Sequence, residues 1–208
     1  MIPDRRPTLV VVGPPGAGKS TIGRLVAERL RVEFTDADDL IVERIGKSIA
    51  DMFLEDGEPA FRALEREVVA SALRSTVGVL GLGGGAVLAD ETRALLRSHR
   101  VLSLRVGLAD GLRRTGMSTA RPLLAGVNPR ATFKALLDQR SPLYHEVATV
   151  EVDTTGRGID QVVHAVLVAL GELPADTPAP PDTPRQREHG AALPTPTIGA
   201  PSPGRSGR

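Results

Sequence analysis

Apolar residues recur along most of the chain in two different patterns. Short apolar runs are typical of buried strands, whereas apolar positions three and four residues apart predict helices. The runs predict strands at residues 8–12, 32–36, 77–82, 100–106 and 148–153. The helical spacing predicts helices at residues 19–32, 38–46, 48–57, 57–75, 90–99, 108–115, 129–141 and 158–170.

Strands therefore alternate with helices up to about residue 171. Parallel strands need a crossover connection, usually a helix, so this alternation predicts an α/β domain around a parallel sheet. Ligands of such sheets bind at the carboxyl ends of the strands, near the point where the strand order changes direction. Two helix starts also carry capping signals, namely Ser48 with Asp51 at the capping-box position, and Asp90.

The pattern stops near Glu172. Residues 172–208 hold nine of the 17 prolines, and their only large aliphatic residues are Leu173, Leu193 and Ile198. Such a segment buries too little apolar surface to offset the entropy of ordering it, so we expect a disordered, proline-rich tail. Removing residues 173–208 is then expected to leave the fold essentially unchanged.

Charge and composition narrow the class of protein. The net charge of +1 gives no sign of attraction to nucleic acid or to an anionic membrane surface. The absence of cysteine excludes disulfides, thiolate catalysis and Cys-based metal sites. No apolar run approaches the roughly 18 residues of a membrane-spanning helix, and the N-terminal run is too short for a signal peptide. We expect a cytoplasmic protein without nucleic-acid or membrane partners.

A phosphate-binding loop follows the first predicted strand. GPPGAGKS, residues 13–20, fits the pattern G-x-x-x-x-G-K-[ST] through Gly13, Gly18, Lys19 and Ser20. In such loops successive N–H groups point at phosphate oxygens, and the following helix adds the positive end of its dipole. The lysine reaches the β- and γ-phosphates and the serine hydroxyl coordinates Mg²⁺. Residues 16–21 are therefore expected to hold ATP or a similar nucleotide.

Acidic residues follow the second predicted strand. Asp36 and Asp38 are two apart, and extended geometry would put both on one face. A carboxylate there can hold Mg²⁺ through water, or accept a hydrogen bond from a hydroxyl that attacks phosphate. The alternative is that one acid merely caps the next helix, a role expected for Asp39. The GTPase signatures D-x-x-G, before the third strand, and N-K-x-D are missing.

Three arginines are candidates for anion binding. Arg121 lies in the polar, glycine-containing stretch GMSTARPLLAGVN, where a mobile arginine could stabilise charge on a transferring phosphoryl group. Arg62 has Glu58 and Glu65 on its helical stripe, which a surface ion pair explains equally well. Arg140 sits at a predicted helix end, where it could simply satisfy the last carbonyls.

Three successive glycines, Gly83–Gly85, follow the strand at 77–82. Glycine loses more conformational freedom on folding than other residues, so three together need a reason. A loose turn is one explanation. The other is close approach of a ligand to backbone, with the Gly84 N–H donating to it. In that case Gly84→Ala weakens binding of the second substrate more than binding of ATP.

Taken together, these stretches resemble shikimate kinases of the bacterial single-domain type over roughly residues 8–170. The matching segments are GPPGAGKSTIGR, FTDADDLIVERIGKSIADMFLEDGEPAFRALE, VLGLGGGAV, RRTGMSTARPLL and QRSPLYHEVA. The resemblance implies a three-layer α/β/α domain at 1–171, with a five-stranded parallel sheet like that of the P-loop nucleoside monophosphate kinases. It also implies a lid at about 116–128 and a monomer that transfers a phosphoryl group from MgATP to the 3-hydroxyl of shikimate, on the route to aromatic amino acids.

Residue roles follow from the same resemblance. The implied ATP-binding residues are Gly16, Ala17, Gly18, Lys19, Ser20, Thr21, Arg114, Arg121 and Arg157. The implied shikimate-binding residues are Asp38, Arg62, Gly83, Gly84, Gly85 and Arg140. One Mg²⁺ ion is implied at Ser20, with Asp36 supporting it through water. Lys19, Asp38 and Arg121 are implied in catalysis, with Asp38 as a candidate base.

Other functions fit some of the same residues. A gluconate kinase shares the phosphate loop, and its substrate also carries hydroxyls and a carboxylate, so only the whole set of motifs favours shikimate. A nucleotide-binding regulator without catalysis is disfavoured because Lys19, Ser20, Asp38 and Arg121 are all present. A docking protein would rest on the proline-rich tail alone.

Overall fold

The computed structural model describes residues 6–115 and 128–181. Arg121, all but the last residue of the expected lid and residues 182–208 of the expected tail therefore lie outside the described residues. The strands of the described part are β1 (Leu9–Val12), β2 (Phe34–Asp36), β3 (Val79–Gly81), β4 (Val101–Arg105) and β5 (Val150–Asp153). Each lies inside the strand predicted for it.

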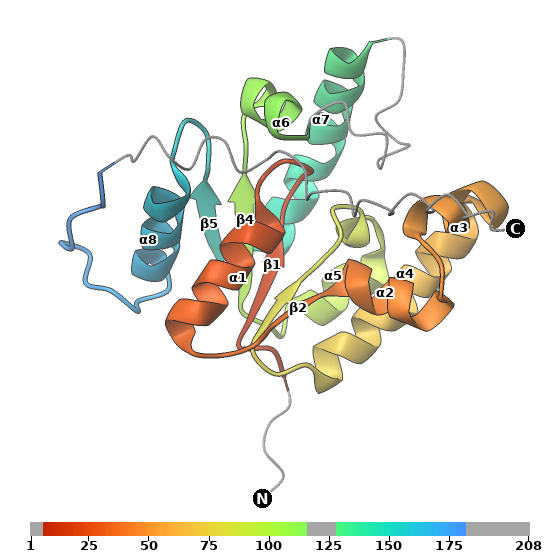
Figure 1. Cartoon of the computed structure of the whole chain (residues 1–208), viewed down its shortest axis with the longest axis horizontal. Coiled ribbons are helices and arrows are strands. Elements are labelled where there is room, and N and C mark those ends of the chain that lie inside the picture. The colour runs from red at the N-terminus through yellow and green to blue at the C-terminus, as the bar shows by residue number, and fades with distance from the viewer. Residues whose placement is uncertain (1–5, 116–127, 182–208) are drawn as a thin grey trace, which may run out of the picture.

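The helices also follow the prediction in order and type (Figure 1). They are α1 (Lys19–Leu30), α2 (Ala37–Ile45), α3 (Ile49–Glu55), α4 (Gly57–Ser75), α5 (Asp90–Leu96), α6 (Leu108–Thr115), α7 (Pro129–Val147) and α8 (Ile159–Ala169), with a short 3-10 helix, η1 (Ala86–Leu88), after β3. The 3-10 helix was not predicted, because three residues are too few to show a helical period.

The five strands form one parallel sheet in the order β2-β3-β1-β4-β5. β1 is central, with Val10 opposite Leu80 of β3 on one side and Val101 of β4 on the other. The chain moves from β1 to one edge and later crosses to the other, so the switch in strand order falls at β1. The sequence-based expectation of a five-stranded parallel sheet is confirmed.

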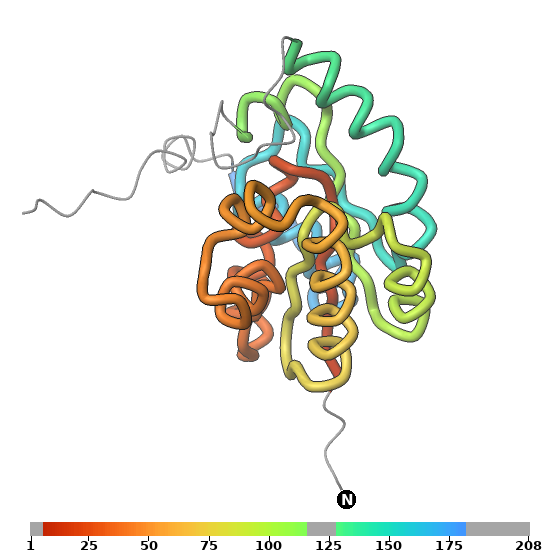
Figure 2. Tube along the Cα trace, turned by 90° about the vertical axis from the view of Figure 1, so that its right-hand side faces the viewer, coloured from red at the N-terminus to blue at the C-terminus, as the bar shows by residue number. Residues whose placement is uncertain are grey.

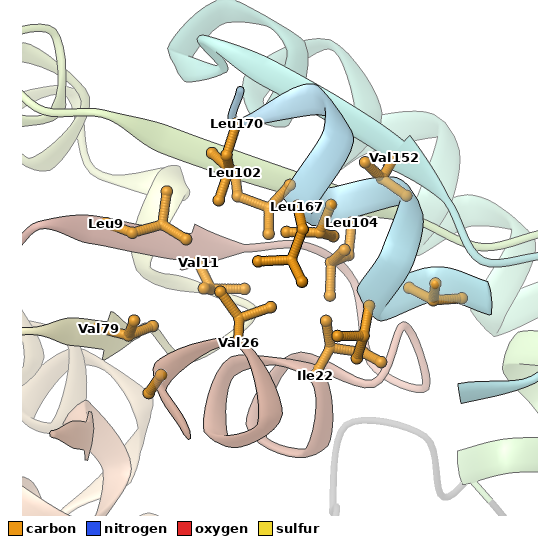
Figure 3. Close-up of a cluster of buried hydrophobic side chains, with 14 of the residues drawn as sticks. Leu9, Val11, Ile22, Val26, Val79, Leu102, Leu104, Val152, Leu167 and Leu170 are labelled. Atoms are coloured by element: carbon orange, nitrogen blue, oxygen red, sulfur yellow. The ribbon is translucent and has the colours of Figure 1, made fainter. Parts of the chain in front are cut away.

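The central strand is buried on both faces by alternate side chains. Leu9 and Val11 belong to a cluster formed with α1 and α8, which also contains Val26 and Leu167 (Figure 3). Val10 and Val12 belong to a second cluster with α4, α5 and α7. Because side chains alternate along a strand, a strand covered by helices on both faces reads as a continuous apolar run. The two clusters make the domain a three-layer α/β/α structure.

The two predicted caps have different outcomes. Ser48 caps α3 as predicted, with its Oγ accepting from the Asp51 N–H at 3.0 Å. Asp90 does not cap α5, because the N-cap position belongs to Ala89. Asp90 is the first helical residue, and its carboxylate pairs with Arg93 one turn later at 2.7 Å.

The largest difference from the predicted elements concerns α7. Its predicted end was residue 141, before Pro142, but the helix continues to Val147. A proline inside a helix removes one backbone hydrogen bond. Here Tyr144 and Val147, both beyond the proline, are buried in the second core cluster, and this packing holds the last turn in helical form. Figure 2 shows α7, green to teal, running along one side of the molecule beside α5.

No helix in residues 6–115 and 128–181 is long and apolar enough to cross a membrane.

The described structure continues past the predicted domain boundary at Glu172. Leu173 packs against the cluster of α1 and α8, and its N–H donates to the Leu167 carbonyl at 3.3 Å. The packed part of the chain therefore includes Leu173, which the compositional boundary excluded.

Two truncations test this boundary. Deleting residues 182–208 is expected to change the thermal midpoint by less than about 2 °C, because Leu173 and its contacts with the cluster of α1 and α8 are kept. Deleting residues 173–208 also removes the half-buried Leu173, worth about 1 kcal/mol, and is expected to lower the midpoint by about 2 to 4 °C. Equal midpoints for the two truncations would contradict the assignment of Leu173 to the core.

Candidate active site

The phosphate-binding loop joins β1 to α1 at the carboxyl end of the sheet (Figure 1). Gly16 and Gly18 have φ angles of 76° and 88°, which side-chain-bearing residues rarely adopt. A Cβ on Gly16 would also lie 2.6 Å from the Gly111 carbonyl oxygen of α6. Lys19 Nζ donates to the Pro14 carbonyl at 3.2 Å, so the lysine folds back over the loop. Glycine is therefore required at both positions for the loop to take this shape.

Ser20 and Asp36 come together across two elements. Ser20 Oγ, in the first turn of α1, donates to Asp36 Oδ2 at the end of β2 at 2.7 Å. Asp36 Oδ1 accepts from the Asp38 N–H at 3.1 Å, which makes Asp36 the N-cap of α2. The expectation that Asp39 caps this helix is wrong, since Asp39 lies exposed in the first turn. One carboxylate thus ends the strand, starts the helix and reaches the phosphate loop.

Asp38 occupies a different kind of position from the predicted one. It was expected beside Asp36 on one face of an extended strand, but β2 ends at Asp36 and Asp38 is the second residue of α2. Both side chains nevertheless line the same cavity. The helix turn, rather than the alternation of a strand, brings them there.

The cavity, of about 230 Å³, lies beside the phosphate loop, at the carboxyl ends of β2 and β3. Nine of the predicted site residues line it: Lys19, Ser20, Asp36, Asp38, Arg62, Gly83, Gly84, Gly85 and Arg140. Its apolar wall, which the sequence did not predict, includes Ile49, Phe53, Phe61 and Leu136. The two phenylalanine rings contact each other, with centroids 4.6 Å apart and planes tilted by 38°. One cavity therefore offers three carboxylates, of Asp36, Asp38 and Glu65, together with two guanidinium groups, exposed backbone and an apolar wall.

Arg62 makes the ion pairs that its helical stripe predicted, and it also lines the cavity. Its Nη2 lies 3.1 Å from Glu58 Oε1, and its Nη1 lies 2.6 Å from Glu65 Oε2. Glu65 is only 4% exposed, so this second pair is buried. Burial raises the pKa of Glu65, the charge of nearby Asp38 adds to the rise, and Arg62 opposes it. The two explanations for Arg62 are thus not exclusive, because its ion pairs orient it within the cavity.

Glu65 was missed as a residue of the cavity. The sequence placed it one helical turn after Arg62, which signals an ion pair but gives no measure of depth. Its burial follows from the packing of α4, against the sheet through Val69 and against α2 and α3 through Val68.

Arg140 lies inside α7 and not at a helix end as predicted. It is 7% exposed, and its Nη1 donates to the Gly84 carbonyl at 3.0 Å. Tyr144, one turn further along α7, donates its hydroxyl to the same carbonyl at 2.6 Å. Tyr144, like Glu65, was not predicted from the sequence as a residue near the site. The available signal was its spacing of four residues from Arg140, which puts both side chains on one helix face.

The three glycines provide space rather than unusual backbone angles. None of them has a positive φ angle. A Cβ on Gly83 would lie 2.8 Å from Asp38 Oδ1 and 3.0 Å from Glu65 Oε1, and a Cβ on Gly85 would overlap the Arg62 guanidinium. At Gly84 the nearest atoms would stay at 3.4 Å or more, an ordinary contact. The steric demand is therefore greatest at Gly85, not at Gly84.

Arg114 and Arg157 lie outside this cavity, and the structure brings them to a second place. Arg114 Nη1 and Nη2 donate to Thr154 Oγ1 and O at 2.9 and 2.8 Å, and the Arg157 N–H donates to the same Thr154 carbonyl at 3.3 Å. The Gly156 N–H donates to Asp110 at 2.8 Å, and this hydrogen bond lowers the pKa of that carboxyl. Both arginines thus border the loop after β5, where it meets α6. Because Gly16 packs against Gly111 of α6, this region adjoins the phosphate loop.

The fold and this site together define a P-loop kinase of the nucleoside-monophosphate-kinase type. The chain belongs to the shikimate kinase family, whose family model matches residues 15–171. The shikimate kinase of Saccharopolyspora erythraea is 63% identical over 161 residues, which cover 77% of this chain and 92% of that protein. The shikimate kinase of Thermobifida fusca is 55% identical over 170 residues, 82% of this chain and 96% of that protein.

Solved structures agree with this assignment. A shikimate kinase from Acinetobacter baumannii in complex with shikimate superposes with a TM-score of 0.77 at 34% identity, over 81% of this chain and 95% of that chain. A gluconokinase from Sinorhizobium meliloti superposes with a TM-score of 0.56 at 20% identity, over 81% of this chain and 93% of that chain. The second likeness shows that the fold is shared between the two kinase families and says nothing about the acceptor.

Proposed function

We propose that this protein is a shikimate kinase, which transfers the γ-phosphoryl group of ATP to the 3-hydroxyl of shikimate. The observation that carries the proposal is one cavity in which the phosphate loop, Asp38, Arg62 and Arg140 meet. Phosphoryl transfer needs this proximity, because it depends on positioning and charge stabilisation more than on covalent chemistry.

The far side of the cavity suits an acid with hydroxyl groups. Arg62 and Arg140 approach the cavity from α4 and α7, and guanidinium groups can donate two parallel hydrogen bonds to a carboxylate. Asp38 accepts hydrogen bonds from hydroxyls, and the apolar wall at Phe53 and Phe61 packs against the carbon ring. The shikimate bound in the related Acinetobacter baumannii enzyme supports this choice of acceptor.

The near side of the cavity holds the nucleotide phosphates. Loop residues 16–21 are proposed to bind them through backbone N–H groups, with Lys19 donating to the β- and γ-phosphates. Arg114 and Arg157, at the loop after β5, are proposed to flank the adenine. Arg121 is proposed to contact the transferring group, and it lies outside the described residues.

One Mg²⁺ ion fits at Ser20 and Asp36. The hydroxyl and carboxylate oxygens lie 2.7 Å apart beside the phosphate loop, and hard oxygen atoms are the ligands that Mg²⁺ prefers. Protein sites for this ion usually supply one or two oxygen ligands and leave the others to phosphates and water. When bound, the ion neutralises charge on the β- and γ-phosphates.

In the proposed reaction the side chains mainly position groups and stabilise charge. Arg62 and Arg140 hold the carboxylate of shikimate, which orients the ring so that its 3-hydroxyl faces the phosphate loop. Asp38 accepts the proton of that hydroxyl as its oxygen bonds to the γ-phosphorus of ATP, and the bond from that phosphorus to the β,γ-bridging oxygen breaks, which releases ADP. Lys19 donates to the oxygens of the transferring group and stabilises their charge.

The test is a substrate panel with the purified full chain. With MgATP, shikimate is expected to release ADP in proportion to shikimate added, and gluconate is expected to give only the background rate. Mass spectrometry of the product should show a shikimate monophosphate. ADP release that does not depend on shikimate, or that gluconate supports equally well, would overturn the proposal.

A pair of variants tests how Gly84 and Gly85 contribute to the cavity. Gly85→Ala is expected to raise the KM for shikimate about tenfold, because the new methyl group displaces the Arg62 guanidinium and weakens its charged hydrogen bonds. Gly84→Ala, where the methyl group makes only ordinary contacts, is expected to have the smaller effect. The KM for ATP should stay nearly unchanged in both. Steady-state kinetics check this, and a larger effect at Gly84 than at Gly85 would contradict it.

A further inference from the structure

The Gly84 carbonyl accepts two side-chain hydrogen bonds from α7. The Tyr144 hydroxyl lies at 2.6 Å and Arg140 Nη1 at 3.0 Å. The two donors are one helical turn apart on α7, whereas Gly84 lies about sixty residues earlier in the chain. A carbonyl oxygen has two lone pairs, so these two donors satisfy it fully.

Tyr144 is built into the core at a fixed place. It is 3% exposed and belongs to the cluster that packs α7 on the sheet. Burial raises the pKa of Tyr144 to about 12. The hydroxyl therefore keeps its proton, and remains a donor to Gly84, throughout the pH range in which enzymes are assayed.

Arg140 has donors left after its bond to Gly84. Its Nε is buried and has no hydrogen-bond partner among the residues that the structure describes. The side chain also lines the cavity. Arg140 is held by its hydrogen bond to the Gly84 carbonyl, so its orientation is fixed only if the turn at Gly83–Gly85 (the Gly84 turn) is itself fixed.

The segment that follows the three glycines, η1, is also connected to α7, through Arg93. Arg93 Nη1 donates to the Val87 carbonyl of η1 at 2.8 Å, and its Nε lies 2.9 Å from Glu146 Oε2 of α7. Helix α7 thus holds the segment after β3 at two points. The point at Tyr144 is the one that adjoins the cavity.

We propose that Tyr144 is a positioning residue for the acceptor substrate, which fixes the Gly84 turn and Arg140 as one unit through its bond to the Gly84 carbonyl. The inference rests on the proposed function, since it assumes that Arg140 binds the carboxylate of shikimate. Tyr144 does not line the cavity, so it acts through Gly84 and Arg140. It sets the affinity for shikimate and leaves the nucleotide site unaffected.

The first test is Tyr144→Phe, which removes only the hydroxyl. The ring keeps its place in the core, and the Gly84 carbonyl keeps Arg140 as a donor. Calorimetry on the full chain is expected to show a rise of about five- to tenfold in the Kd for shikimate, the value of one hydrogen bond. The Kd for ATP and kcat should change by less than about twofold.

The matched control is Ser141→Ala on the same helix. Ser141 Oγ also donates to a backbone carbonyl, that of Leu137 at 2.6 Å, but it is exposed and does not line the cavity. Shikimate affinity should be unchanged in this variant. Wild-type affinity in Tyr144→Phe, or equal losses for shikimate and ATP, overturns the inference while leaving the proposed function intact. Failure of the wild-type protein to bind shikimate overturns both.

A second measurement needs no variant. Tyr144 is the only tyrosine of the chain, and there is no tryptophan, so all tyrosine emission reports on this hydroxyl. Titration with shikimate alone is expected to change that emission saturably, with the same Kd that calorimetry gives. Binding seen by calorimetry without any change in emission would show that Tyr144 is not coupled to the acceptor site.

Discussion

Replacing Asp38 by asparagine is expected to lower kcat by a factor of about 10² to 10⁴ and to leave ATP affinity nearly unchanged. Asparagine has almost the same shape but cannot accept the proton of the attacking hydroxyl. The proposed nucleotide contacts come from the phosphate loop, which the substitution does not touch. Steady-state ADP release and calorimetric titration with ATP measure the two quantities separately.

The structure also predicts that the Asp38→Asn variant folds. Asp38 lies near Glu65, and its negative charge contributes to the raised pKa of that buried carboxyl. Removing one of two neighbouring negative charges relieves repulsion, which opposes the loss of a favourable charge in the first turn of α2, so the thermal midpoint should change little. The α2 cap is kept, because the carboxylate that accepts at the helix start belongs to Asp36 and the donor is the backbone N–H of residue 38.

Asp39→Asn is the matched control for Asp38→Asn. Asp39 is the adjacent residue in the first turn of α2, it is exposed, and it does not line the cavity. The kcat of the Asp39→Asn variant should equal that of the wild type. A loss of ATP affinity in Asp38→Asn as large as its loss of kcat would place Asp38 in the nucleotide site and contradict its assignment as the base.

Arg140→Lys is expected to raise the KM for shikimate by about 30- to 100-fold, with a much smaller effect on the KM for ATP. Lysine keeps the positive charge but loses the planar fork that binds both oxygens of a carboxylate. The expected factor corresponds to the loss of one charged hydrogen bond, about 2 to 3 kcal/mol. Steady-state kinetics with each substrate varied in turn measures both KM values.

Loss of packing is a smaller concern at this position. The Gly84 carbonyl keeps the Tyr144 hydroxyl as a donor at 2.6 Å when Arg140 is replaced, so no buried carbonyl is left unpaired. Arg130→Lys, at the exposed start of the same helix, is the matched control and should behave as the wild type. An unchanged KM for shikimate in Arg140→Lys would remove Arg140 from the carboxylate site.

Much of the fold could be predicted because the signals were local. Both ends of α4 were predicted at residues 57 and 75, where glycine and Pro59 mark the start and the apolar stripe ends. The phosphate loop was equally clear, since its glycines, lysine and serine are consecutive in the sequence. Where the conformation depends only on residues close together in the sequence, residue type and spacing are enough to predict it.

Predictions failed where distant packing competed with a local signal. Pro142 suggested the end of a helix, but burial of Tyr144 and Val147 carries α7 past it. Asp39 was a plausible cap, but Asp36 takes that role because it stands where β2 ends and also accepts from Ser20. In each case an interaction with another element outweighed a preference worth about 1 to 3 kcal/mol.

By itself the sequence determined the parallel α/β class, the phosphate loop and most of the polar residues that line the cavity. The tertiary structure alone decided the burial of Glu65, the two hydrogen bonds from α7 to the Gly84 carbonyl, and the lack of space for a side chain at Gly85. The physical reason is the range of the interactions. Helix periods, caps and loop motifs act within a few residues, whereas the cavity wall joins segments tens of residues apart. Those segments meet because the strands are parallel, which puts all their carboxyl ends at the same end of the sheet, and because the order β2-β3-β1-β4-β5 makes β2, β3 and β1 neighbours.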